Sequence, residues 1–214
     1  MLMPTNTGVK MDYKEIISKY LEEKSNETEV IALLREHKKL LASPKNKFTI
    51  LNKEYFSLIL KLAKNSKGKI KYHALIILSH IDFFLEAKNF YELCRIAAEN
   101  SKDDDGNIRQ ANFIIIKNLN AWMITLPLIN KLQNASQAEV DMFYESFKYL
   151  FLKLQHLFYD EGYWSVRKSI LQSLEVMLPK FYDVAKFWKD EEEVGIANKL
   201  KEEINKELHH GTRN

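Results

Sequence analysis

Turn-forming residues are scarce in this chain of 214 residues, which holds only 6 glycines and 4 prolines. An all-β fold needs many tight turns, and glycine and proline are the residues that such turns favour. The scarcity therefore argues against an all-β fold and favours long helices. Because no segment shows convincing strand alternation either, we expect an all-α protein.

Long hydrophobic runs and cysteine pairs are also missing. The longest nearly uncharged apolar stretch, Ala74 to Ile81, is interrupted by Ser79 and His80 and falls far short of the ~20 residues that a membrane-spanning helix needs. The first ten residues lack the basic and apolar regions of a signal peptide. The single cysteine, Cys94, is expected to be a small buried hydrophobe. Together these absences predict a cytoplasmic protein without a membrane segment.

Common catalytic and metal-binding signatures are absent as well. The chain has no glycine-rich phosphate loop, no nucleophile elbow and no paired-cysteine motif. His73 and His80 lie seven residues apart, whereas two metal ligands on one helix face are usually four apart. We interpret them as ordinary hydrogen-bonded histidines and predict neither a metal nor a cofactor. A non-enzymatic protein is therefore favoured, although no feature settles the question.

Apolar residues recur at helical spacing along most of the chain. The clearest run follows Ser136, which forms a capping-box sequence with Glu139 three residues later. In that run, apolar residues follow one another at steps of three or four: Val140, Phe143, Phe147, Leu150, Leu154 and Leu157. We expect about ten helices, joined by short loops and arranged as antiparallel helical hairpins.

Glycine and proline predict where several helices end. Gly68 is suited to a left-handed position that closes the helix before it, and the next helix is expected from about Lys69 to Ala87. A later helix is expected from Trp164 to Leu178 and to stop at Pro179, because proline removes a helical hydrogen bond. We further predict three regions: a disordered leader at 1–10, a single helical domain at 11–208 and a frayed tail at 209–214.

One pattern occurs three times. Residues 103–119 begin with an acidic turn, followed by Arg109 one turn into a strongly apolar helix. A weaker copy carries Arg167, 58 positions later, and a fainter copy carries Lys71, 38 positions earlier. The pattern resembles the second helix of HEAT repeats, in which an acidic turn precedes a hydrophobic residue, an arginine and a small residue.

The resemblance covers about residues 52–178 and implies a HEAT-like superhelix, that is, paired helices stacked into a right-handed solenoid. The family's acidic turn matches Asp105 and its arginine matches Arg109 and Arg167, so these residues are expected to form a structural ladder. The arginine is expected to pair with the turn of a neighbouring unit. The spacing of 58 exceeds a normal repeat, and a generic irregular helical bundle stays open as the alternative.

The resemblance also implies a class of function. HEAT-like proteins are scaffolds that bind a protein partner on a concave face built from their second helices. Some are DNA glycosylases, whose site needs a tryptophan and a carboxylate on one helix face. Trp188 and Asp190 are two residues apart and do not share a face, so we assign that catalytic role to no residue, and a DNA-repair glycosylase stays open as a minor alternative. Asp103 to Asp105 are expected to cap a helix rather than to bind a cation.

Positive charge is concentrated between Arg35 and His73. This segment holds eleven basic and two acidic residues, a net charge of +9, whereas the whole chain is +3. The lysines around one predicted helix–helix turn are Lys61, Lys64, Lys67, Lys69 and Lys71. Such a field attracts a phosphate backbone or an acidic protein surface. Two interpretations stay open: a nucleic-acid-binding patch and a solvated lysine-rich face.

Overall fold

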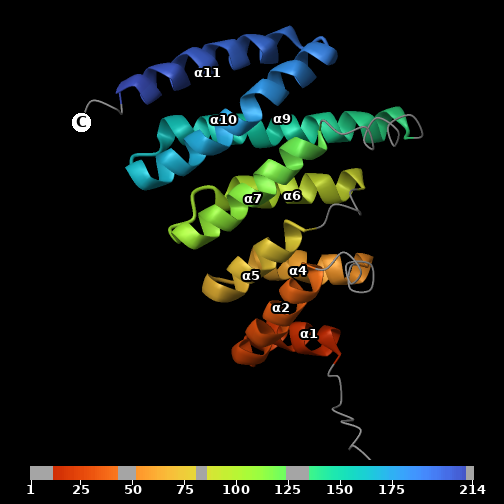
Figure 1. Cartoon of the computed structure of the whole chain (residues 1–214). Helices are drawn as coiled ribbons and strands as arrows, with labels where there is room; N and C mark the ends of the chain where they lie inside the picture. Colours follow the sequence, from red (N-terminus) through yellow and green to blue (C-terminus); the bar gives the residue numbers. More distant parts are fainter. Residues whose placement is uncertain (1–11, 43–51, 81–85, 124–134, 211–214) are drawn as a thin grey trace, which may run out of the picture. The chain divides into compact units, whose positions relative to one another are not determined.

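The computed structural model describes residues 12–42, 52–80, 86–123 and 135–210 (Figure 1). These residues form helices and contain no strand, which confirms the all-α prediction. The predicted leader at 1–10 lies outside the described residues, as do the last four residues of the predicted tail.

Nine helices are described, and their contacts group them into two compact units, residues 1–78 (unit 1) and 79–214 (unit 2). The helices are α1 Tyr13–Glu23, α2 Glu27–Leu41, α4 Lys53–Asn65, α5 Gly68–Leu78, α6 Ala87–Asn100, α7 Gly106–Trp122, α9 Gln137–Asp160, α10 Trp164–Phe187 and α11 Glu191–His210. The prediction of a single domain over 11–208 stays a prediction.

Unit 1 consists of two helix pairs that stack layer on layer. Helix α1 packs against α2 and α4, and α5 packs against α4 and α2. The first helices of the pairs, α1 and α4, therefore form one layer, and the second helices, α2 and α5, form the other. The buried apolar side chains between them include Ile17, Leu34, Ile59, Leu62 and Ile70.

A cluster of two tyrosines and one histidine joins α1, α2 and α4 in unit 1. The Tyr55 hydroxyl lies 2.7 Å from His37 Nδ1, to which it is hydrogen-bonded, and the Tyr13 ring meets Tyr55 edge to face at 5.2 Å. Burial raises the pKa of Tyr55 and lowers the pKa of His37. Both groups are therefore held neutral at neutral pH, with their polar atoms joined to each other.

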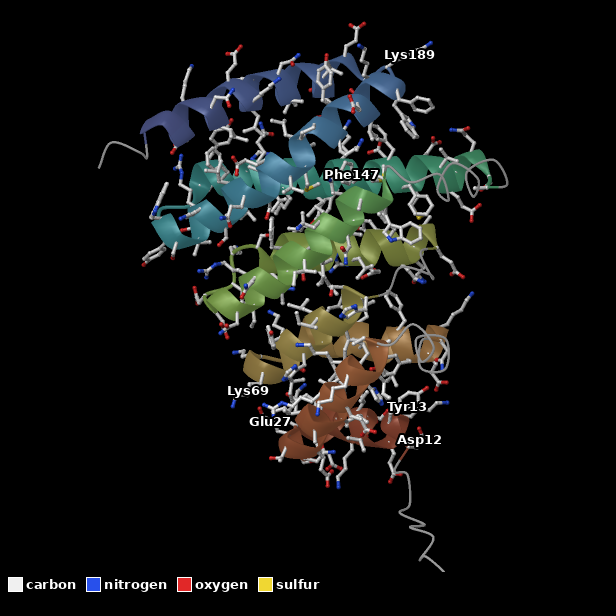
Figure 2. The ribbon with its side chains drawn as sticks, in the orientation of Figure 1. Asp12, Tyr13, Glu27, Lys69, Phe147 and Lys189 are labelled. Carbon is white, nitrogen blue, oxygen red and sulfur yellow. The ribbon has the colours of Figure 1, made fainter. Side chains whose placement is uncertain are left out.

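Unit 2 repeats the same packing order with one more helix. Helix α6 packs against α7 and α9, helix α10 packs against α7 and α9, and α11 packs against α10 (Figure 1). Phe147 lies in the interior of this unit (Figure 2), and Phe151 and Phe181 stack at 3.8 Å between ring centres, almost parallel. Cys94 is fully buried, as expected, and burial raises the pKa of its thiol.

Helix α9 begins with the predicted capping box. Ser136 Oγ accepts from the Glu139 backbone N–H, and the Glu139 side chain accepts from the Ser136 backbone N–H. The predicted apolar run then supplies the buried face of the helix, including Phe143, Phe147 and Leu150. The capping prediction is thus confirmed by local hydrogen bonds.

The structure corrects the predicted end of α5 and the predicted role of Gly68. Helix α5 ends at Leu78 rather than near Ala87, and Ser79 and His80 lie in a turn; serine disfavours a helix interior because its hydroxyl competes for backbone hydrogen bonds. Gly68 does have the expected positive φ, +53°, but it begins α5, whereas Ser66 is the C-cap residue of α4.

Helix α10 continues through Pro179, where we expected it to stop. Proline removes a backbone donor and leaves a carbonyl in the preceding turn without its helical partner. The carbonyl that loses its partner is that of Glu175, four residues before the proline. Beyond the proline, Phe181 and Val184 are buried, and Phe181 stacks on Phe151 of α9. Packing of the following turns therefore overrides the local signal.

Candidate functional site

The five lysines of the predicted basic patch come from α4, α5 and the turn between them, and their grouping stays a prediction. Lys61 and Lys64 lie on α4, Lys67 precedes α5, and Lys69 and Lys71 belong to α5. Lys61 lines an open pocket of about 510 Å³ between α1 and α4, which it shares with Glu22 and Lys24. Lys61 thus belongs to the layer of first helices, whereas Lys69 belongs to the layer of second helices.

The second helices of unit 1 carry a different basic cluster, which includes two residues outside the predicted patch. The pKa of His73 on α5 is lowered by burial and by the positive charges of Arg35, Lys38 and Lys69. The Lys38 ammonium also lies 5.9 Å from the centre of the Tyr72 ring. Residues three or four apart on a helix share a face, which explains why α2 and α5 present these groups together. We call this surface the basic face: Arg35, Lys38, Lys69, Tyr72 and His73.

The start of α5, at the edge of the basic face, lacks the usual negative charge. Its first turn contains no acidic residue, and Lys67 and Lys69 flank Gly68 there; Lys69 projects from this turn (Figure 2). The first turns of α2, α4, α9 and α11 each contain glutamate, whereas those of α6, α7 and α10 also contain no acidic residue. What sets α5 apart is the pair of lysines beside Gly68. Because a helix N-terminus carries a partial positive charge, the lysines add to that charge instead of balancing it.

Two polar atoms beside this turn have no hydrogen-bond partner among the described residues. They are Ser66 Oγ and His73 Nδ1, on side chains that are only 5% and 8% exposed. Buried polar groups are normally hydrogen-bonded, and each exception calls for an explanation. Both atoms belong to residues next to or within the basic face, where the charges of Arg35, Lys38 and Lys69 act on His73.

In unit 2, Arg109 binds the backbone of its own acidic turn. Its Nη1 donates to the carbonyls of Asp103 at 2.6 Å and Asp104 at 3.0 Å, and its Nε donates to Ser169 Oγ on α10 at 3.3 Å. The main partner of the guanidinium is therefore its own turn, not the turn of a neighbouring unit as expected. One hydrogen bond nevertheless links it to the next second helix.

The acids of this turn act as helix caps. Asp105 Oδ1 accepts from the Asn107 backbone N–H at 2.8 Å, and Asp103 Oδ1 accepts from the Asp105 backbone N–H at 3.0 Å. These bonds satisfy backbone donors at the start of α7. Among the residues that the structure describes, no group of three histidine, cysteine or acidic side chains could hold a metal ion.

Arg167 lies in an aromatic surface that the sequence analysis missed. Its guanidinium sits 4.5 Å from the centre of the Phe158 ring and forms an ion pair with Glu207 on α11 at 2.6 Å. An open pocket of about 350 Å³ lies beside it, and its lining residues are Phe158, Tyr159, Arg167, Glu203, Lys206 and Glu207.

Three large aromatic side chains stand exposed around the adjoining α9–α10 turn. Tyr163 is 78% exposed, Trp164 is 56% exposed and Tyr159 is 47% exposed. The Tyr159 hydroxyl is also hydrogen-bonded to Glu203. We call this surface the aromatic corner: Phe158, Tyr159, Tyr163, Trp164 and Arg167. The density of aromatic residues between 158 and 164 was the signal available in the sequence.

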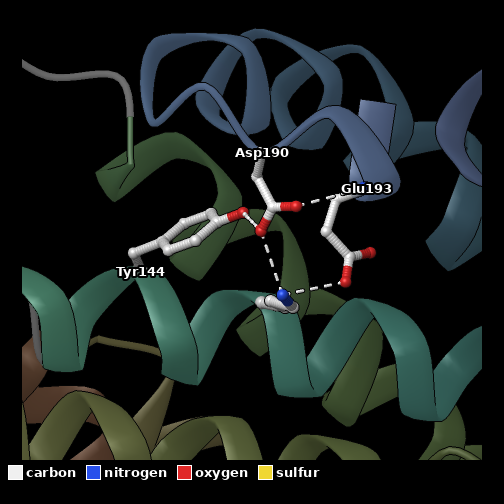
Figure 3. Close-up of polar contacts among 4 residues, drawn as sticks. Tyr144, Asp190 and Glu193 are labelled. Carbon is white, nitrogen blue, oxygen red and sulfur yellow. Dashed lines mark hydrogen bonds and ion pairs between the residues drawn. The ribbon is translucent and has the colours of Figure 1, made fainter. Parts of the chain in front are cut away.

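A partly buried ion cluster joins the start of α11 to α9 (Figure 3). Lys148 Nζ donates to Asp190 Oδ2 at 3.0 Å and to Glu193 Oε1 at 2.9 Å, and the Tyr144 hydroxyl donates to Asp190 Oδ2 at 2.8 Å. Glu193 is only 3% exposed. We call Tyr144, Lys148, Asp190 and Glu193 the Lys148 cluster.

Pairing favours the charged forms of Lys148 and Asp190. Burial alone would lower the pKa of Lys148, but its bonds to Glu193 and Asp190 raise it above the usual value. Hydrogen bonds from Tyr144 and Lys148 lower the pKa of Asp190. The Tyr144 ring also stacks on Trp188 at 5.0 Å. Each charged side chain thus has an oppositely charged partner in the cluster. This arrangement suits a structural role in holding α9 and the start of α11 together.

No family model, no curated protein and no solved structure matches this chain. The HEAT-like resemblance therefore stays a prediction. Within the described ranges, no helix combines the length and the apolar character needed to cross a bilayer. The two surfaces that we consider as candidate binding sites are the basic face of unit 1 and the aromatic corner of unit 2.

Proposed function

We propose that this chain is a HEAT-like helical-repeat scaffold of the cytoplasm that binds a protein partner and catalyses no reaction. The shared packing order supports the repeat assignment. In each unit, first helices pack on first helices (α1 on α4, α6 on α9) and second helices pack on second helices (α2 on α5, α7 on α10). Stacked helix pairs of this kind are the unit of helical-repeat proteins.

The aromatic corner is the observation that carries the protein-binding function. Tryptophan, tyrosine and arginine dominate the binding energy of protein interfaces, and Tyr163, Trp164 and Arg167 lie within one turn of the start of α10. The two rings expose much of their surface to solvent. The neighbouring pocket of about 350 Å³ offers space for a side chain of the partner.

The position of this surface agrees with the expected mode of binding. Trp164 and Arg167 belong to α10, a second helix, and second helices build the binding face in the resemblance. No residue takes the catalytic role of a HEAT-like glycosylase, because Trp188 stacks on Tyr144 and Asp190 is bound to Lys148. A scaffold accounts for these residues without assigning them chemistry.

Site-specific photo-crosslinking tests the proposal. We would place p-benzoylphenylalanine at Trp164 and, as a matched control, at Tyr91, which is a half-exposed aromatic residue on α6. We expect a discrete protein adduct at Trp164 and none at Tyr91. In addition, Tyr163→Ser with Trp164→Ser should reduce recovery of that partner about tenfold or more with unchanged melting. An adduct that forms equally at both positions would refute the assignment.

A further inference from the structure

We infer that the basic face of unit 1 binds the phosphodiester backbone of a nucleic acid, a ligand separate from the protein partner proposed for unit 2. The inference rests on the arrangement of Arg35, Lys38 and Lys69 around Tyr72 and His73. It uses residues of unit 1 alone. Its success or failure is therefore independent of what binds the aromatic corner.

The charge of the chain is divided unequally. Residues 1–78 hold 15 basic and 8 acidic side chains, and residues 79–214 hold 17 and 21, which gives formal charges of +7 and −4. On the basic face the imbalance is local, because every charge that shifts the pKa of His73 is positive. A surface of this kind draws anions toward it over about one Debye length.

Three of the eight acidic residues of unit 1 lie or act away from the basic face. Glu54 forms an ion pair with Lys14 at 2.6 Å, and Glu22 lines the pocket between α1 and α4. Glu36 is on α2, and its negative charge acts on the pKa of His37. His37 in turn is hydrogen-bonded to Tyr55. These carboxylates therefore leave the cations of the basic face available to an external anion.

The α5 N-terminus supplies a second attraction for phosphate. Backbone N–H groups and a positive dipole end favour anions at a helix start, and here Lys67 and Lys69 replace the usual acidic residue. Two residues before Gly68, Ser66 carries a buried hydroxyl without a hydrogen-bond partner among the described residues.

The lack of apolar anchors favours a nucleic acid over an acidic protein. Protein interfaces are built around buried aromatic and aliphatic anchors. The exposed large hydrophobic side chains of the described residues all belong to unit 2. A phosphate backbone, by contrast, is held by cations alone. The one aromatic ring on the basic face, Tyr72, lies beside Lys38 and suits stacking on an unpaired base.

Binding would be measured by fluorescence anisotropy with the full chain. The probes are a labelled 20-nucleotide poly(U) RNA, the matching poly(dT) DNA and a 20-base-pair duplex. About four phosphate contacts predict that log affinity falls against log salt with a slope of about −3 for the single strands. Comparison of the three probes identifies which nucleic acid supplies the phosphates.

A charge-reversal triple variant tests the site. Arg35→Glu, Lys38→Glu and Lys69→Glu together should weaken binding about 30-fold or more. The matched control reverses three exposed lysines of unit 2, Lys168→Glu, Lys199→Glu and Lys201→Glu, and should change affinity less than about threefold. Lys38→Gln with Lys69→Gln, a milder change, should still weaken binding and guards against misfolding of the triple variant. Crosslinking from Trp164 should be unchanged in all of them.

Stacking is tested separately by Tyr72→Leu. This variant should weaken binding of the single strands about fivefold or more and leave duplex binding unchanged. Three results would overturn the inference: no binding of any probe at low salt, an equal loss in the control triple variant, or competition by poly-glutamate as strong as competition by unlabelled RNA. The last result would assign the basic face to an acidic protein.

Discussion

Units 1 and 2 pack their helices in the same order but expose opposite chemistry. Unit 1 carries a formal charge of +7, and its second helices present arginine and lysine. Unit 2 carries −4 and exposes tyrosine and tryptophan around the α9–α10 turn. Helix packing depends on the buried faces, which leaves the exposed positions free to differ. One arrangement of helices can therefore present two kinds of binding surface.

The interiors of the two units differ as well. Unit 1 buries a neutral pair, His37 with Tyr55, whereas unit 2 buries the charged Lys148 cluster. A neutral pair costs little to desolvate, but a buried charge is tolerated only while its partners are present. All three tryptophans lie in unit 2, at positions 122, 164 and 188. Tryptophan emission therefore reports on unit 2, and helical circular dichroism reports on both units.

The largest effect is expected from Phe181→Ala in the core of unit 2. Phe181 is fully buried and stacks on Phe151 at 3.8 Å, so its truncation leaves a large cavity and should cost about 4 kcal/mol. Urea unfolding followed by tryptophan emission would measure the loss. If the urea midpoint from circular dichroism shifted as much as the midpoint from tryptophan emission, the two units would unfold together. Their stabilities could then not be compared separately.

Removal of the central cation of the Lys148 cluster should have the next largest effect. Lys148→Ala leaves Asp190 and the buried Glu193 without their counter-ion, which should destabilise unit 2 by about 3 kcal/mol. The matched control is Lys14→Ala, which removes an exposed ion pair with Glu54 in unit 1 and should leave stability almost unchanged, because solvent screens exposed ion pairs. Equal effects of the two variants would show that burial of the cluster is unimportant.

Arg109→Ala should have a smaller effect, confined to stability. The variant loses three hydrogen bonds, to the Asp103 and Asp104 carbonyls and to Ser169, at a total cost of about 2 kcal/mol. Arg109→Lys, which cannot reproduce the planar fork of donors, should recover part of this. Unchanged melting together with loss of the crosslink at Trp164 would contradict a structural role for Arg109.

The smallest effect concerns pH and should separate the two units. The pKa values of His37 and His73 in unit 1 are lowered by burial, so the unfolded chain takes up protons first as pH falls below about 6.5. Unit 1 should therefore lose stability between pH 7.5 and 5.5. Asp190 in unit 2 has a lowered pKa, so its contribution is lost only in stronger acid, below the ordinary aspartate pKa of about 3.9. Urea unfolding at both pH values, followed by the two spectroscopic signals, would test the difference, and a shift in tryptophan emission alone would contradict it.

Local patterns predicted local structure well. The capping box of Ser136 and Glu139 depends on neighbouring residues, and the structure contains it. Pro179 shows the limit, because its helix continues through it and Phe181 beyond it stacks on Phe151 of another helix. No local pattern carries such a contact.

The candidate site shows the same limit. The sequence grouped Lys61 with Lys69 because they are near each other along the chain, but helix geometry directs Lys61 into the pocket between α1 and α4. Together with Lys69, two other cations act on His73: Arg35 and Lys38. Both come from α2. Their position follows from the packing of α2 on α5, which only the fold reveals.

The burial of Cys94 has a practical consequence. It is the single cysteine of the chain, it is fully buried in α6, and its pKa is raised, so thiol reagents reach it only when unit 2 opens. The reactivity of this thiol therefore reports local opening of the native protein. The rate at which a thiol reagent modifies it, followed with time under native conditions, would report how often this part of the molecule opens, without denaturant and without an added probe.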